Sequence, residues 1–304
     1  MASDFVRELV DSGIHFGHRA SRWNPKMAPY IFGKRNTIHI IDVRETLKGL
    51  VRAKKFISQT VARGKDILFV GTKRQARGPI KVYATRVGMP YVSERWLGGT
   101  LTNFRTVRSR LARLEELEKA EIDGSAQEYS KKMIATRTRE LNKIRRNLEG
   151  IRNMDKLPGA MVVVDVHRER NAVREAKKLG IPTVCLIDTD SDPDFADLPI
   201  PGNDDAIRAI DTVLAHLTDA VELGKKARAA EDAAEAERRR SEPPRRGPAP
   251  GGAAQPARED GASPESKEQR NGSEPPAKRR MSDSSRNEEA GLTAATATER
   301  DRPS

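Results

Sequence analysis

Residues 93–105 have the sequence Ser-Glu-Arg-Trp-Leu-Gly-Gly-Thr-Leu-Thr-Asn-Phe-Arg, and the pattern of the chain differs on its two sides. Apolar runs alternate with helical patterns before this stretch, whereas a long helical pattern follows it. The two adjacent glycines permit a tight turn with positive φ. Because Arg95 and Trp96 bring a cation and an aromatic ring together, we expect a hinge that binds a polyanion. A purely structural junction around a buried Trp96 is the alternative.

Most of the chain around this hinge has the pattern of an α/β domain. Apolar runs predict buried strands at 66–73, 160–165 and 182–187, a strand flanked by other layers at 38–43 and a short strand at 90–92. Amphipathic patterns predict helices at 45–63 and 169–179, and a last helix that ends near residue 225. Strands and helices that alternate through short connections predict a mostly parallel sheet with helices on both faces.

Residues 102–151 are predicted to form an inserted helical hairpin. Apolar residues repeat at helical spacing from Val107 to Leu117 and again from Ile134 to Ile151, with a helix-breaking segment between the two runs. Two helices joined by a short turn should pack antiparallel as a coiled coil. A coiled-coil scaffold protein that associates with itself is an alternative interpretation of this segment.

These patterns divide the chain into three parts. Residues 1–101 and 152–228 form the α/β domain, residues 102–151 form the hairpin, and residues 229–304 form a tail. The tail is rich in Pro, Gly, Ser, Ala and mixed charges and has almost no residues that could form a core, so we expect a disordered low-complexity segment. No apolar run is long enough to span a membrane, and the first residues do not read as a signal peptide, so we expect a cytoplasmic protein.

The charge of the chain indicates the class of partner. The net charge is +12, and because the tail carries basic and acidic residues in nearly equal numbers, the positive excess belongs to the part that folds. Between Arg63 and Arg110 there are eleven basic residues and two acidic ones. So uneven a ratio favours an anionic partner such as RNA. The loop around Trp23, which mixes aromatic rings with cations, suits irregular RNA because bases stack on rings and guanidinium planes.

Two groups of residues invite an enzymatic or metal-binding interpretation. His15 and His18 could share a ligand, but no Cys, Asp or Glu nearby in the sequence completes a metal site, so we expect backbone or RNA partners for them. Five aspartates between Asp188 and Asp197 crowd one loop at the carboxyl end of a strand, where α/β proteins bind ligands. A metal-dependent enzyme that uses this loop is the alternative to an RNA-binding protein; ordinary turn chemistry also accounts for the aspartates. Cys185 lies within an apolar strand and is expected to pack in the core.

Several motifs resemble one known family, that of bacterial-type small-subunit ribosomal protein S-two. They occur in the family's order across residues 5 to about 225. The motifs are His-Phe-Gly-His at 15–18, Arg-Trp-Asn-Pro-Lys-Met at 22–27, Phe-Val-Gly-Thr-Lys-Arg at 69–74, Arg-Trp-Leu-Gly-Gly-Thr-Leu-Thr-Asn at 95–103 and Ile-Pro-Gly-Asn-Asp-Asp-Ala-Ile at 200–207. Asp190 stands where the family usually has Asn, and the tail has no counterpart in the family pattern.

The resemblance implies a flavodoxin-like three-layer sandwich with an inserted antiparallel helical hairpin. It also implies a structural protein of the small ribosomal subunit that binds 16S rRNA between head and body, supports docking of ribosomal protein S-one and contacts neighbouring small-subunit proteins. No catalysis, cofactor, metal, membrane or small-molecule substrate is expected. Ten cations are the candidate RNA contacts: Arg19, Arg22, Lys26, Lys73, Arg74 and Arg95 on the globular face, and Arg105, Arg108, Lys143 and Arg146 on the hairpin.

Overall fold

The structure is a computed structural model that describes residues 2–123 and 130–241. Its centre is a five-stranded sheet in which every neighbouring pair is parallel, in the order β5-β4-β6-β7-β8. The strands are β4 (Ile67–Val70), β5 (Tyr91–Val92), β6 (Ala160–Val164), β7 (Thr183–Ile187) and β8 (Leu198–Pro201). Numbered within the sheet alone, this order is 2-1-3-4-5, the flavodoxin-like order. The predicted α/β fold class is therefore confirmed.

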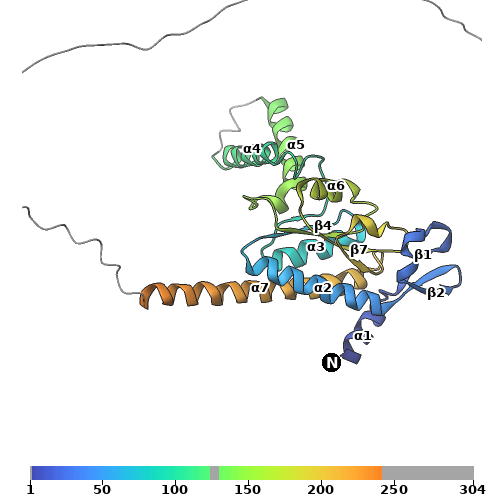
Figure 1. The fold of residues 1–304 in the computed structure, drawn as a ribbon. Coiled ribbons are helices and arrows are strands. Elements are labelled where there is room, and N and C mark those ends of the chain that lie inside the picture. Colours follow the sequence, from blue (N-terminus) through green and yellow to red (C-terminus); the bar gives the residue numbers. More distant parts are fainter. Residues whose placement is uncertain (1, 124–129, 242–304) are drawn as a thin grey trace, which may run out of the picture. The chain divides into compact units, whose positions relative to one another are not determined.

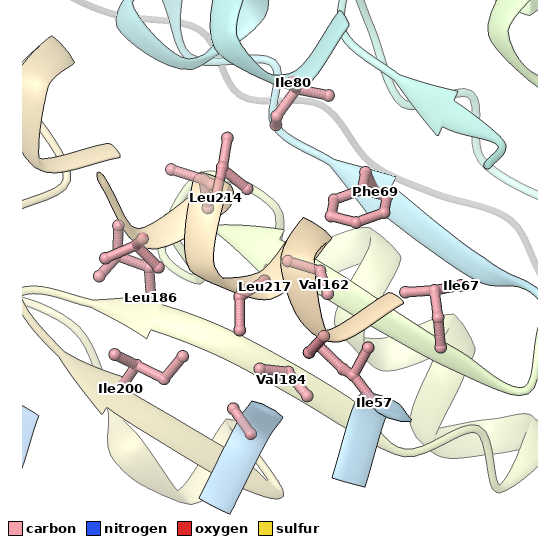
Figure 2. Packing of buried hydrophobic residues seen from close by; sticks show 14 of the residues in the cluster. Ile57, Ile67, Phe69, Ile80, Val162, Val184, Leu186, Ile200, Leu214 and Leu217 are labelled. Atoms are coloured by element: carbon pink, nitrogen blue, oxygen red, sulfur yellow. The ribbon is translucent and has the colours of Figure 1, made fainter. Parts of the chain in front are cut away.

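Helices α2 (Val43–Ala62), α3 (Arg74–Arg86) and α7 (Ile207–Ser241) cover one face of this sheet (Figure 1). Every second strand side chain points toward them because side chains alternate across a strand. Figure 2 shows Phe69, Val162 and Val184 from three neighbouring strands packed with side chains from these helices. Helix α1 (Ala2–Asp11) adds Leu9 to the same cluster.

The other face of the sheet is covered by α6 (Arg170–Leu179) and by residues of the hinge and the inserted helices. The intervening strand side chains point this way, among them Leu68, Val163 and Cys185. Cys185 is fully buried, and burial raises the pKa of its thiol to about 12, which confirms its core role. With both faces of every central strand covered, continuous apolar runs are required, as the sequence has them.

A second, three-stranded sheet lies near the amino terminus. It is antiparallel, in the order β1-β3-β2, and consists of β1 (Phe16–Arg19), β2 (Ile31–Arg35) and β3 (Ile38–Ile41). The short 3-10 helices η1 (Ala20–Arg22) and η2 (Pro25–Tyr30) join β1 to β2. The sequence predicted β3 but described residues 15–26 as a loop, so β1 is a correction. Its side chains are at most half-buried, and this leaves little apolar pattern to recognise.

Helices α4 (Phe104–Ile122) and α5 (Lys131–Leu148), with the 3-10 turn η4 (Glu149–Ile151), form the insert. The two helices contact each other through Leu114, Leu117, Leu141 and Ile144. Two helices are thus present where the sequence placed them, whereas their packing as an antiparallel coiled coil stays a prediction. Part of the break between them, residues 124–129, lies outside the described residues.

The last helix is longer than the sequence indicated. Helix α7 does not end near residue 225 but continues to Ser241, so the first residues assigned to the tail are helical. Alanine, glutamate and arginine, which are strong helix formers, dominate this extension. The tail prediction for residues 242–304 lies outside the described residues.

Candidate nucleic-acid interface

The carboxyl edge of the parallel sheet is where this fold places ligands, because neighbouring connections leave it in opposite directions between β4 and β6. The turn after β4 contains Thr72 and Lys73, Arg74 begins α3, and the turn after β6 begins with Asp165. Charged side chains from the amino-terminal segment and from the loops after β7 and β8 reach the same edge. The edge is therefore the first place to compare with the predicted RNA contacts.

Lys73 lies in a network of carboxylates, of which Asp165 and Asp204 are buried and Asp205 is exposed. Its Nζ atom is 2.6 Å from Asp204 Oδ1, 2.7 Å from Asp205 Oδ1 and 3.4 Å from Asp165 Oδ2. Burial disfavours the ammonium, but the attraction of Asp204 and its neighbours outweighs burial and raises the pKa of Lys73. Lys73 therefore stays charged and neutralises these acids, and it is not an open cation for a nucleic acid.

His18 completes this network from the amino-terminal sheet. Its Nδ1 atom is 2.8 Å from Asp188 Oδ2, and its Nε2 atom is 3.2 Å from Asp205 Oδ2. The hydrogen bond to Asp188 and the surrounding negative charge raise the pKa of His18 to about 9. Burial and the nearby Asp165 and Asp188 raise the pKa of the Asp204 carboxyl as well. His18 is thus a cation at neutral pH that attaches β1 to the central sheet.

This network predicts that the protein loses stability at alkaline pH. A histidine whose pKa rises on folding contributes stability that is complete below its ordinary pKa of 6.5 and is lost as the pH rises through about 9. We expect the free energy of unfolding to fall by about 1 to 2 kcal/mol across this range, allowing for solvent screening. Urea unfolding at several pH values in the presence of a chelator measures it.

The variant His18→Gln should show a smaller alkaline loss than the wild type. His167→Gln, at an exposed position after β6, is the matched control and should retain the full loss. An unchanged loss in His18→Gln would contradict the assignment of His18.

Three side chains of the network could also hold a metal ion. Ligand atoms of His18, Asp188 and Asp204 lie within 4.8 Å of one another, and Asp204 Oδ2 is buried without a hydrogen-bond partner. Imidazole and carboxylate groups are ligands that suit zinc. No metal site is evident in the sequence because no Cys, Asp or Glu close to His18 along the chain completes one. The fold supplies the carboxylates from positions about 170 residues later.

Of the five aspartates in the loop after β7, Asp188 belongs to the network described above, whereas three others have different partners. Asp192 and Asp194 both pair with Lys26 Nζ, at 2.9 and 2.5 Å. Asp197 accepts hydrogen bonds from the backbone N–H and the hydroxyl of Thr183, at 2.8 and 3.0 Å. These carboxylates therefore have separate structural partners. Lys26, a predicted RNA contact, is one of those partners.

The ten predicted cations fall into two groups. Lys26, Lys73, Arg108 and Arg146 are in ion pairs, Arg108 with Asp155 and Arg146 with Glu94. The other six are exposed and have no ion-pair partner among residues 2–123 and 130–241. We call these six the open cations: Arg19, Arg22, Arg74, Arg95, Arg105 and Lys143.

Glu175 on α6 fixes the hinge. Its carboxylate accepts hydrogen bonds from Trp96 Nε1 at 3.1 Å, from the N–H groups of Gly99, Leu101 and Thr102 at 2.8, 3.0 and 3.2 Å, and from the Thr102 hydroxyl at 3.2 Å. Gly99 has a φ of 89°, which favours glycine. Burial opposes ionisation of Glu175, but these donors outweigh it and lower its pKa. The sequence analysis did not identify Glu175.

The two tryptophans have different roles. Trp96 is buried with 9% of its surface exposed, which agrees with the alternative of a structural Trp96 at the hinge. Trp23 is 37% exposed, and its ring centre lies 5.2 Å from that of His39. Trp23 is therefore the tryptophan whose ring a nucleic-acid base can reach.

A cleft of about 690 Å³ opens beside the hinge, between the carboxyl edge of the sheet and α5. Its lining contains five cations and a single acid. The lining residues are Thr72, Arg77, Glu94, Arg95, Asn142, Lys143, Arg146, Asn147 and Arg168. Three of the ten predicted contacts meet here, whereas Arg77 and Arg168 were missed because each belongs to a helix or turn with no local motif.

The chain matches a family model described as "Ribosomal protein S2" over residues 9–224. It is 62% identical over 225 residues to the small ribosomal subunit protein uS2 of Rhodopirellula baltica, an alignment that covers 74% of this chain and 86% of the relative. It is 53% identical over 229 residues to the protein of the same name from Mycobacterium ulcerans, covering 75% and 83% respectively. Within the described residues, no helix has both the length and the apolar character needed to cross a membrane.

Proposed function

Because this chain belongs to the ribosomal protein S2 family, a family of structural rather than catalytic proteins of the small ribosomal subunit, we propose that it binds 16S rRNA. The observation that carries the proposal is the set of open cations. Their charge is not neutralised by any acid in the described chain, and they lie on the hinge, on the insert and on the segments near the carboxyl edge. Rows of unpaired cations repel one another, and RNA phosphates relieve that repulsion while they release counterions.

We also propose the location and partners that the family resemblance implies. The chain lies between head and body of the small subunit, in the cytoplasm, and supports docking of ribosomal protein S-one. The amino-terminal sheet exposes Phe16 and Phe32, with Phe32 78% exposed, and Trp23 is exposed in the connection from β1 to β2. Exposed apolar side chains of this kind are suited to a contact with a neighbouring protein or with unstacked bases.

Sedimentation of the tagged full-length chain through a sucrose gradient tests the function. The expected result is that the chain migrates with the small ribosomal subunit and is released as the salt concentration rises, since phosphate contacts weaken steeply with salt. A chain that stays at the top of the gradient at moderate salt would contradict the proposal. A chain that migrates with the subunit but resists salt would indicate attachment through protein contacts instead.

A further inference from the structure

The cleft beside the hinge, lined by the residues given above, contains an internal carboxylate that holds its two walls together. Glu94 Oε2 is 3.2 Å from Arg77 Nη1 of α3, and it accepts hydrogen bonds from Arg146 Nε and Nη2 of α5 at 3.1 and 3.0 Å. One anionic oxygen thus receives two guanidinium groups from elements on opposite sides of the cleft. This is the arrangement in which arginines bind a phosphate oxygen.

Glu94 neutralises only a fraction of the charge in the cleft. Arg95 and Lys143 make no ion pair within the described chain, and the Arg168 guanidinium donates only to the Thr72 hydroxyl, at 3.2 Å. Arg146 remains 68% exposed although it is paired. The cleft therefore has space, a surplus of positive charge and cations that are open to solvent, which together select a polyanion.

We propose that the cleft binds the phosphodiester backbone of an RNA strand, and that a phosphate replaces Glu94 as the anion held by Arg77 and Arg146. This inference rests on the proposed function and identifies the site at which the α/β domain and the insert bind the same RNA strand. Glu94 is then an internal competitor: it holds the arginines in position while the protein is free and gives way to RNA.

A free nucleotide shares the phosphate chemistry, but two features favour a strand. The turn after β4, where flavodoxin-like folds hold a ligand phosphate, is already filled, because Glu169 Oε1 accepts from the N–H and the hydroxyl of Thr72 at 2.7 and 2.5 Å. The lining also contains no aromatic or aliphatic residue that could hold a nucleobase. The cleft is thus built for a backbone and not for a base.

The test compares the binding of three full-length variants to small ribosomal subunits depleted of this chain. Arg95→Glu combined with Lys143→Glu should bind at least about tenfold more weakly than the wild type. It should also lower the slope of log affinity against log salt by about 1 for each lost contact. The control, Arg52→Glu combined with Lys55→Glu on the exposed side of α2, changes the net charge equally and should behave as the wild type.

Glu94→Gln gives the opposite expectation. It keeps a hydrogen-bond acceptor but removes the competing charge, so binding to the depleted subunits should tighten a few-fold. Thermal unfolding of each variant checks that the fold is retained. A separate titration of the free protein with ATP tests the alternative of a nucleotide ligand, and ATP should bind far more weakly than the subunit does.

The possible outcomes distinguish a failure of this inference from a failure of the proposed function. If the wild type binds subunits and the Arg95/Lys143 variant matches the α2 control, the inference is overturned and the proposed function stands. If Glu94→Gln weakens binding while the fold is intact, Glu94 is a contact and not a competitor, and the inference is overturned. ATP binding as tight as subunit binding would assign the cleft to a nucleotide. A wild type that does not bind subunits at all overturns both proposals.

Discussion

Replacement of Glu175 with alanine is expected to lower the free energy of unfolding by about 3 kcal/mol or more. The change removes the acceptor of five hydrogen bonds and leaves the indole N–H of Trp96 and three backbone N–H groups of the hinge without their partner. Part of this segment is buried, and a buried donor that loses its partner bears its full desolvation cost. Urea unfolding of the full chain measures the loss.

The effect should be local as well as large. Hydrogen exchange should accelerate first at the amides of Gly99, Leu101 and Thr102, since these donate to Glu175. Glu115→Ala, which removes an exposed acid from α4, is the control and should change stability by less than about 0.5 kcal/mol. If the two variants are equally stable, Glu175 does not fix the hinge.

The loss of stability caused by Glu175→Ala should depend on pH in a definite direction. The pKa of Glu175 is lower in the folded protein than its ordinary value of 4.5, so its contribution is present above that value and is lost as the pH falls through the folded pKa. The difference in stability between the wild type and Glu175→Ala should therefore shrink at acid pH.

Four of the five strands of the central sheet could be predicted from the sequence because each carries a local apolar run, whereas β8 was not predicted, since the prolines of its Leu-Pro-Ile-Pro sequence are unusual in a strand. Residues 160–164, Ala-Met-Val-Val-Val, alternate between the two apolar clusters, so both faces must be apolar and the run is continuous. The insert could be located for a similar reason, since Val107, Leu111 and Leu114 mark one buried side of α4.

The amino-terminal sheet and the end of α7 could not be predicted in the same way. Strand β1 is four residues long and half exposed, and its pairing with β3 is a long-range property that no local pattern records. The end of α7 has no apolar stripe to mark it, and the helix continues through residues of high intrinsic propensity, with an ion pair between Arg228 and Asp232 one turn apart.

The sequence indicated which cations belong to the candidate site, but not which of them are paired with acids of the same chain. Lys73 and Arg74 are adjacent in the sequence, yet Lys73 is held by Asp204 and Asp205 while Arg74 is exposed. Acids far along the chain, 131 residues away for Lys73 and 47 for Arg108, decide which cations remain open. Arg108 shows the same effect, because its pairing with Asp155 means that reversing its charge would disturb the fold as well as any RNA contact.

The second large effect is expected for three open cations outside the cleft. Charge reversal of Arg19, Arg22 and Arg74 together should reduce binding to small ribosomal subunits depleted of this chain by at least about a hundredfold, because each site changes from attracting to repelling a phosphate. All three are exposed and without ion pairs in residues 2–123 and 130–241, so the fold should be retained. Sedimentation of subunits with each variant measures the bound fraction.

The control reverses Arg52, Lys55 and Lys226, which are exposed on α2 and on α7. Lys226 follows Lys225, which donates to the carbonyl of Val87 ahead of β5, so it lies toward the amino edge of the sheet and away from the candidate surface. The control variant has the same net charge as the variant reversed at Arg19, Arg22 and Arg74, and it should bind subunits as the wild type does.

The salt dependence of subunit binding by these three proteins tests the central claim most directly. The account predicts a steep loss of wild-type and control affinity with rising salt, and a weaker, flatter dependence for the variant reversed at Arg19, Arg22 and Arg74. Identical affinities and identical slopes for the variant and the control would show that the open cations do not bind RNA.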